Sequence, residues 1–162
     1  MGIDIHMFIV KQKECLAKEI FDGRNSEWFS NLQQDGWNNI YDHLPIQCGF
    51  SPDAPDEFEE KYKDKLGYYG FNYIKVSDFK EWFVKYRPDI DAGWVTTYEK
   101  WRIEKKGYVP EDLCHYLSEN DDIRDMHFVE VENKYDCSKW LYDYLNDHDI
   151  PNDATIWYCF DC

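Results

Sequence analysis

The chain has 162 residues, 43% hydrophobic and 19% aromatic, which is enough for a domain with a real core and too apolar for a disordered protein. Its formal net charge is −15, and this excess argues against direct binding of nucleic acid, whose phosphates require a basic surface. No apolar run reaches the roughly 18 residues of a membrane helix, and no signal-peptide pattern is present. We therefore expect a cytoplasmic protein that contacts no membrane.

The N-terminal stretch predicts a β-hairpin. Residues 1–10 alternate in polarity like a strand with one apolar face, and Asp4 and His6 share its other face. The stretch 11–14 is typical of a turn, and residues 15–21 resemble a second strand that pairs back on the first. A further turn is expected directly after it, at Asp22-Gly23.

Helix and strand patterns alternate along the rest of the chain. A short helix is expected within residues 22–32, after a cap at Asn25 or Ser26. Further helices are expected at residues 55–67, 78–87 (capped by Ser77), 94–107, 110–120 and 136–147. Strands are expected at residues 68–76, 125–133 and 154–162. The last strand is apolar on both faces, which is typical of the middle of a sheet. Helix and strand periodicity places Trp82, Trp101, Trp140 and Trp157 on buried faces.

This order of elements predicts the fold class. Strands and helices mix without a regular βαβ repeat, and the hairpin favours antiparallel pairing. We therefore expect an α+β fold, a mostly antiparallel sheet with packed helices, in a single domain over residues 1–162.

Several short motifs resemble a known group of proteins. The opening Met1-Gly2-Ile3-Asp4-Ile5-His6 is similar to the M-G-C-D-I-H start of a family of small phage and prophage proteins. A G-R-N element at residues 23–25, the stretch 73–82 and the ending Phe160-Asp161 also resemble that family, whereas residues 88–125 do not. The resemblance implies a phage or prophage origin, location in a host bacterial cell and a compact α+β domain. It implies no reaction.

Asp4 and His6 form the first candidate site. Side chains at i and i+2 of a strand project the same way from Cα atoms about 6.5–7 Å apart, within reach of one metal ion. A third ligand is needed, and Asp161 is a candidate if the first and last strands are neighbours; His43 and His127 are others. The alternatives are a structural Asp–His hydrogen bond or two exposed residues at an edge. No resident cofactor is expected otherwise.

Arg24 and Asn25 form a second candidate, a pocket for a small anion beside Asp4 and His6. The guanidinium fits a carboxylate or phosphate, and a helix start offers free backbone N–H groups. The alternative is an ion pair from Arg24 to a local acid such as Asp22 or Glu27.

The third candidate is the acidic C-terminal part of the chain. Residues 107–162 contain 14 acidic and 3 basic residues, a net charge of −11. The acids proposed to contact a partner are Glu119, Asp121, Asp122, Asp125, Glu130, Glu132, Asp143 and Asp147. Such a surface favours a basic protein partner, although acidity can also serve solubility alone.

Two functions follow from these candidates. The first is an acidic binding protein from a phage that inhibits a host nucleic-acid-binding system, for example a defence effector, by occupying its basic surface. The second is a metal-dependent enzyme, or a small-anion or nucleotide binder, built on Asp4, His6 and Arg24. The six cysteines are expected to be reduced thiols. We favour the first function, because the chain lacks a complete catalytic motif.

Overall fold

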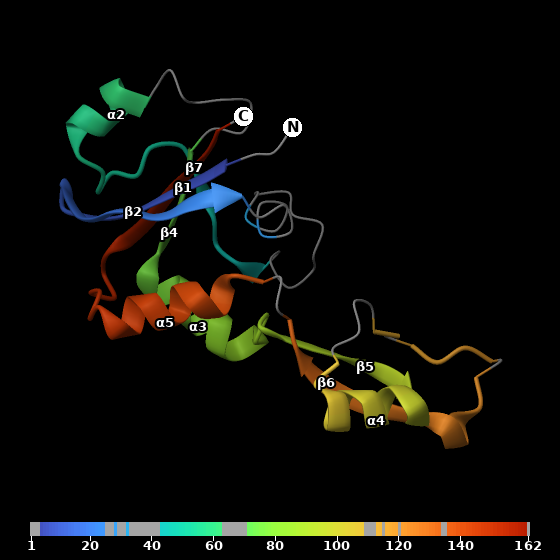
Figure 1. Cartoon of the computed structure of the whole chain (residues 1–162). Coiled ribbons are helices and arrows are strands. Elements are labelled where there is room, and N and C mark those ends of the chain that lie inside the picture. The colour runs from blue at the N-terminus through green and yellow to red at the C-terminus, as the bar shows by residue number, and fades with distance from the viewer. Residues whose placement is uncertain are drawn as a thin grey trace. The chain divides into compact units, whose positions relative to one another are not determined.

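The computed structural model of the chain describes residues 4–24, 28, 32, 43–62, 71–108, 113–114, 116–119, 121–133 and 136–161. The chain divides into two compact units, Met1–Arg87 with Tyr135–Cys162, and Pro88–Lys134 (Figure 1). The α+β fold with a mostly antiparallel sheet is confirmed. The prediction that residues 1–162 form one domain stays a prediction. Among the described helices, none has the length and apolar character needed to span a membrane.

The larger unit, unit 1, is built on an antiparallel five-stranded sheet in the order β2-β1-β7-β4-β3. Its strands are β1 (Asp4–Lys11), β2 (Glu14–Arg24), β3 (Gln47–Cys48), β4 (Phe71–Lys75) and β7 (Thr155–Asp161). The C-terminal strand β7 lies in the middle, between β1 and β4. Its central place agrees with the prediction made from its apolar faces, because a strand covered on both sides must be apolar on both sides.

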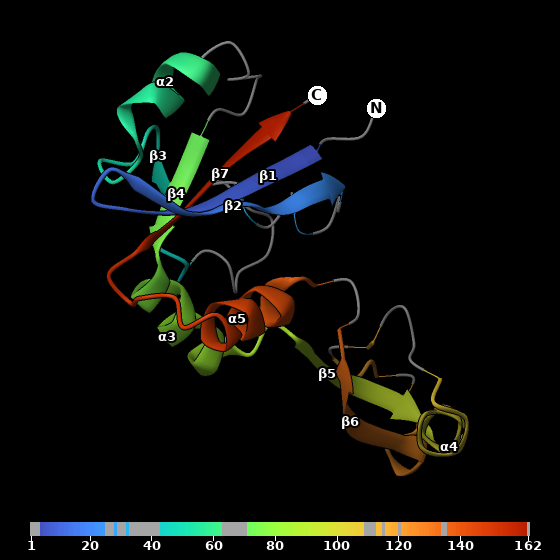
Figure 2. The same cartoon turned by 60° about the vertical axis from the view of Figure 1, so that its left-hand side comes forward.

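Helices cover both faces of this sheet (Figure 2). The helices α3 (Val76–Tyr86) and α5 (Ser138–Asp147) lie side by side under one face, where the ring of Phe83 stacks on that of Tyr142. The short helix α2 (Asp56–Tyr62) covers the other face with Phe58 and Tyr62. Trp157 of β7 is fully buried in this second cluster, among five aromatic rings.

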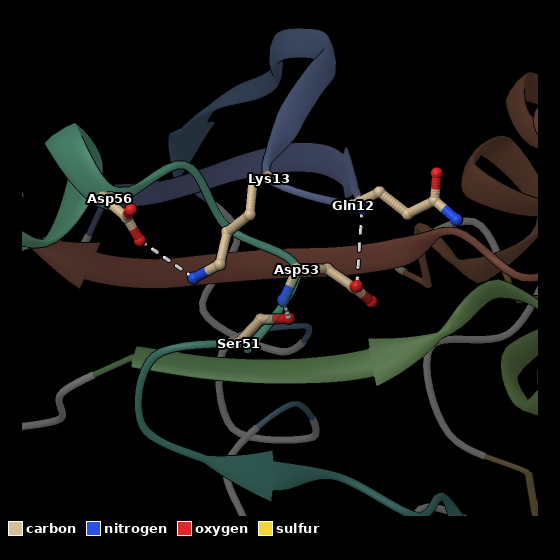
Figure 3. A network of polar contacts seen from close by, with 5 residues as sticks. All are labelled: Gln12, Lys13, Ser51, Asp53 and Asp56. Carbon is tan, nitrogen blue, oxygen red and sulfur yellow. Dashed lines mark hydrogen bonds and ion pairs between the residues drawn. The ribbon is translucent and has the colours of Figure 1, made fainter.

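A polar network holds the β1–β2 turn against the segment that precedes α2 (Figure 3). Gln12 and Lys13 form a two-residue turn with positive φ angles, as a tight hairpin requires. The backbone N–H of Lys13 donates to the carbonyl of Asp53 at 2.9 Å, and its ammonium pairs with Asp56 at 2.9 Å. The Asp53 carboxylate also accepts a 2.8 Å hydrogen bond from the hydroxyl of Thr155 in β7. One aspartate therefore joins the hairpin to the central strand.

Unit 2 is a two-stranded antiparallel sheet of β5 (Ile90–Thr96) and β6 (Met126–Glu132), with the helix α4 (Thr97–Lys106). Its buried core consists of Val95, Leu113 and Val131, and Ile103 of α4 packs against it. The segment at Leu113 packs closely against β5 at Gly93, which has no side chain. A Cβ at this position would lie 2.7 Å from the Leu113 Cβ and would clash with it. Among the described residues this core is small for a 47-residue unit, and the apolar cluster that they form lies on one face of the sheet.

The structure corrects several boundaries predicted from the sequence. Asp22-Gly23 is not a turn, because both residues continue β2 and pair with β1. The helix predicted at 94–107 begins only at Thr97. Thr96 caps it, because its side chain accepts a hydrogen bond from the Glu99 N–H, and the residues from Ile90 to Thr96 form β5. The described residues of the helix predicted at 110–120 are not helical, and Cys114 bridges to β5 instead. The helix predicted to begin after Ser77 begins at Val76.

Two of the four tryptophans expected to be buried are not. Trp82 and Trp157 are 3% and 0% exposed, as predicted, but Trp101 is 46% and Trp140 is 41% exposed. Both exposed tryptophans lie on helices whose core-facing side is narrower than the apolar stripe in their sequence. The pattern predicted the helices correctly and their buried faces only in part.

Candidate functional site

Polar side chains gather at the end of the sheet where β1 begins. Asp4 lies opposite Arg24 of β2 and opposite Asp161 of β7 in the strand register. The Arg24 guanidinium donates a 2.5 Å hydrogen bond to the Asp4 carboxylate. This bond holds the pKa of Asp4 below its ordinary value and raises that of Arg24. Arg24 therefore pairs with Asp4, and not with Asp22.

The next pair along the same face contains His6. In the register, His6 lies directly opposite Asp22 of β2 on one side and Cys159 of β7 on the other. The Nδ1 atom of His6 is 3.1 Å from a carboxylate oxygen of Asp22. Asp22, His6 and Cys159 thus occupy one row across three adjacent strands. From the sequence, the pairing of β1 with β7 was only a condition for Asp161 to approach Asp4, and the row through His6 was not expected.

This row lines a pocket of about 180 Å³ in unit 1. The remaining wall residues are Phe8, Glu19 and Tyr62. Glu19 has a positive φ of 50° and lies in a bulge where residues 18–20 of β2 face the single residue Phe8 of β1. Bulges of this kind redirect side chains and are frequent beside functional sites. Aromatic rings and acidic groups therefore enclose the imidazole and the thiol.

The residues proposed as metal ligands are only partly brought together. Asp4 and Asp161 are register neighbours, but the side chain of Asp161 lies outside the described residues, and His6 faces Asp22. His127 contacts the hydroxyl of Thr97 at 2.9 Å in unit 2, and the ring of His43 stacks on Tyr86. Within the described residues, no group of three or more His, Cys, Asp or Glu side chains is placed to hold a metal ion.

The second residue proposed for an anion pocket, Asn25, lies outside the described residues. Arg24 is 66% exposed, and its bond to Asp4 occupies the guanidinium with a carboxylate of the chain itself. An anion at this position would have to compete with Asp4. The geometry here favours the ion-pair alternative over the anion pocket, although the carboxylate is Asp4 and not the Asp22 or Glu27 named from the sequence.

The eight acids expected to contact a partner are divided between the units. Glu119, Asp121, Asp122, Asp125, Glu130 and Glu132 belong to unit 2, and Asp143 and Asp147 belong to α5 of unit 1. Three of them are occupied locally: Asp121 accepts from the Ser118 N–H, Asp122 pairs with Arg124, and Asp143 pairs with Lys139. The Arg124 hydrogen bond also lowers the pKa of Asp122. Glu119, Asp125, Glu130, Glu132 and Asp147 are exposed.

One face of the β5–β6 sheet gathers exposed acids and aromatic rings, and we call it the open face. It consists of Ile90, Ala92, Trp94, Thr96, Met126, Phe128, Glu130 and Glu132, which alternate with the core residues of the opposite face. Trp94 and Phe128 are direct cross-strand partners, and their rings meet edge to face at 5.5 Å. Phe128 is 57% exposed. Glu130 and Glu132 extend the same face along β6.

Sequence reasoning found some of these residues and missed others. The alternation along β6 correctly predicted exposed glutamates at 130 and 132. Asp22 was assigned to a turn and Trp94 to a helix, so neither was placed on a sheet face. The row through Cys159 depends on which strands become neighbours, and no local pattern carries that information.

No protein-family model, curated protein or solved structure matches the chain. The resemblance to small phage and prophage proteins therefore stays a prediction.

Proposed function

We propose that the protein is an acidic binding protein that uses the open face of unit 2 to occupy a basic, nucleic-acid-binding surface of a partner protein. The observation that carries this proposal is the open face itself, where the exposed ring of Phe128 meets the partly buried ring of Trp94 beside two exposed glutamates. An inhibitor of a host system encoded by a phage would act in this way, by competing with nucleic acid for the partner.

Exposed apolar groups concentrate in unit 2. Of the eight large hydrophobic residues that are exposed in the described chain, five belong to this 47-residue unit: Tyr98, Trp101, Tyr116, Ile123 and Phe128. Aromatic residues are enriched at protein interfaces and supply most of the binding energy there. An isolated two-stranded sheet is marginal in water, and the described part of this unit has three buried core residues, so burying the open face against a partner would also stabilise the unit.

Charge favours a basic partner. Unit 2 contains twelve acidic and six basic residues, and neither β5 nor β6 contains a lysine or an arginine. Four of the six basic residues, Lys100, Arg102, Lys105 and Lys106, belong to α4, whose Ile103 packs on the opposite side of the sheet. The open face is therefore acidic without local compensation from its own strands. Lysine and arginine side chains of a partner could pair with the glutamates and stack on the aromatic rings.

The experiment is a comparative capture followed by titration. Tagged wild-type protein and a Glu130→Lys/Glu132→Lys variant are incubated with bacterial lysate, and the proteins held only by the wild type are identified and purified. Binding of the purified partner is then measured at several salt concentrations and in competition with DNA or RNA. We expect DNA or RNA to displace the protein and affinity to fall with salt, since exposed charges are screened over about 8–10 Å.

Matched variants make the test specific. A Glu59→Lys/Glu60→Lys variant changes the net charge equally, but on α2 of unit 1, and we expect it to bind like the wild type. Phe128→Ala should weaken binding about 30-fold or more if the ring is an interface anchor worth about 2 kcal/mol. A purified partner that binds all these variants equally, or binds together with nucleic acid, would refute the proposal.

A further inference from the structure

Asp22, His6 and Cys159 lie in the order carboxylate, imidazole, thiol, which is the order that activates a cysteine as a nucleophile. A nucleophilic thiol needs a base close to it and a third group that orients the base. The Asp22 carboxylate is 3.1 Å from His6 Nδ1 and so fixes the imidazole ring through that nitrogen. On the other side of β1 lies β7, where Cys159 is the direct register partner of His6. Side chains of such partners begin from Cβ atoms about 4.5–5.5 Å apart on the same face.

Cys159 also borders a partly open pocket. Cys159 is 1% exposed, but it lines the 180 Å³ pocket together with His6, Asp22 and Glu19. The other described cysteines differ from it: Cys48 and Cys114 are exposed, Cys137 packs against the core under the other face of the sheet, and burial raises the pKa of the partly buried Cys15 thiol. Cys159 alone among the described cysteines combines a pocket with a histidine that a carboxylate holds in place.

We propose that Cys159 is a catalytic nucleophile, with His6 as its base and Asp22 as the residue that positions His6. In the first step His6 Nε2 takes the thiol proton, and Sγ attacks the carbonyl carbon of an ester. The carbon–oxygen bond to the alcohol breaks, the alcohol leaves with the proton from His6, and an acyl thioester remains on Cys159. Water then attacks the thioester, His6 takes a proton from it and returns it to the leaving thiolate. The products are a carboxylic acid and an alcohol.

The pocket restricts the substrate to small uncharged acyl compounds. Its volume is below the roughly 300 Å³ at which sites for drug-sized ligands begin. Glu19 and Asp22 add negative charge to the wall and disfavour anionic substrates, whereas the rings of Phe8 and Tyr62 offer flat apolar contacts. This site lies in unit 1 and does not use the open face, so the proposal about Cys159 can be tested independently of the proposed binding function.

The first experiment compares the reactivity of the cysteines in the folded protein. The protein is treated with iodoacetamide, a small uncharged electrophile, and the modified positions are followed over time by mass spectrometry of peptides. We expect Cys159 to be modified faster than Cys48 and Cys114 despite its burial, and to be protected from a bulky maleimide that cannot enter the pocket. Modification of Cys48 and Cys114 with Cys159 unchanged would overturn the proposal.

The second experiment tests the roles of the three residues with 4-nitrophenyl acetate. We expect hydrolysis by the wild type, an acetyl group on the peptide that contains Cys159, and loss of both in Cys159→Ala. His6→Gln should slow acetylation about 100-fold or more, as expected for removal of a general base. Asp22→Asn should also slow it, and Asp22→Glu, which restores the carboxylate, should recover much of the rate.

The controls separate chemistry from folding. Each variant is melted alongside the wild type, and only variants with an unchanged melting temperature are compared; if His6→Gln is destabilised, His6→Asn replaces it. Glu104→Lys, which alters an exposed residue of α4 in unit 2, should hydrolyse the ester like the wild type. Acetylation of Cys159 at the same rate in folded His6 and Asp22 variants would overturn the assignment.

Discussion

The burial of Trp157 makes a quantitative prediction about stability. Its side chain is fully buried, and its ring lies 4.4 Å from that of Phe71 and 5.6 Å from those of Phe8 and Phe58. Trp157→Ala removes the centre of this cluster and leaves a cavity, at a cost of about 3–5 kcal/mol. For a chain of this size, that cost lowers the melting temperature by roughly 6–20 °C.

A second substitution at the same position separates volume from polarity. The indole Nε1 of Trp157 is buried and has no hydrogen-bond partner among the described residues. Trp157→Phe keeps most of the apolar contact and removes this unsatisfied donor, whose burial itself costs about 1–3 kcal/mol. We therefore expect Trp157→Phe to be much less destabilising than Trp157→Ala.

The assay is urea unfolding followed by circular dichroism, with Trp101→Ala and Trp140→Ala as matched controls. Both control side chains are more than 40% exposed, so their removal should cost much less than that of Trp157. If Trp140→Ala destabilised the protein as much as Trp157→Ala, the assignment of the buried faces would be wrong. Equal costs for Trp157→Ala and Trp157→Phe would refute the argument about the indole nitrogen.

Three further predictions concern polar and backbone contacts. Asp53→Ala should cost about 1–3 kcal/mol in urea unfolding because it leaves the buried hydroxyl of Thr155 without its acceptor, whereas Asp53→Asn should cost less. The hydrogen bond from Arg24 lowers the pKa of Asp4 below its value in the unfolded chain, so its stabilisation is present above about pH 4 and is lost as the pH falls through the folded-state pKa. The difference in stability between wild type and Asp4→Asn should therefore shrink as the pH falls below about 4, and a difference that does not change with pH would contradict this. Gly93→Ala should destabilise unit 2 by about 1–3 kcal/mol, seen as faster hydrogen exchange in β5, because the new Cβ overlaps a neighbouring segment; unchanged exchange would show that this segment can move away.

The sequence alone determined the features that depend on local pattern. The alternation of residues 1–10 and the short turn at 11–14 predicted the β1–β2 hairpin, and the two apolar faces of β7 predicted its central position. These predictions succeeded because the two-residue alternation of a strand, the residues of a turn and the apolar character of both faces of a strand can all be read from a few consecutive residues. Exposed glutamates at 130 and 132 were found in the same way.

The tertiary structure decided the features that depend on distant neighbours. Trp94, Tyr98 and Trp101 have helical spacing, yet Trp94 lies in β5, because pairing with β6, more than thirty residues later, extends the chain up to Thr96. Trp101 is exposed because the small core of unit 2 covers only part of α4.

The row of Asp22, His6 and Cys159 also depends on distant neighbours in the sequence. It joins residues 22, 6 and 159 through two strand pairings, and a shift of one residue in either register would send the partner of His6 to the opposite face of the sheet. A strand's own sequence shows which of its residues share a face, but only the folded sheet sets which residues of other strands lie beside them.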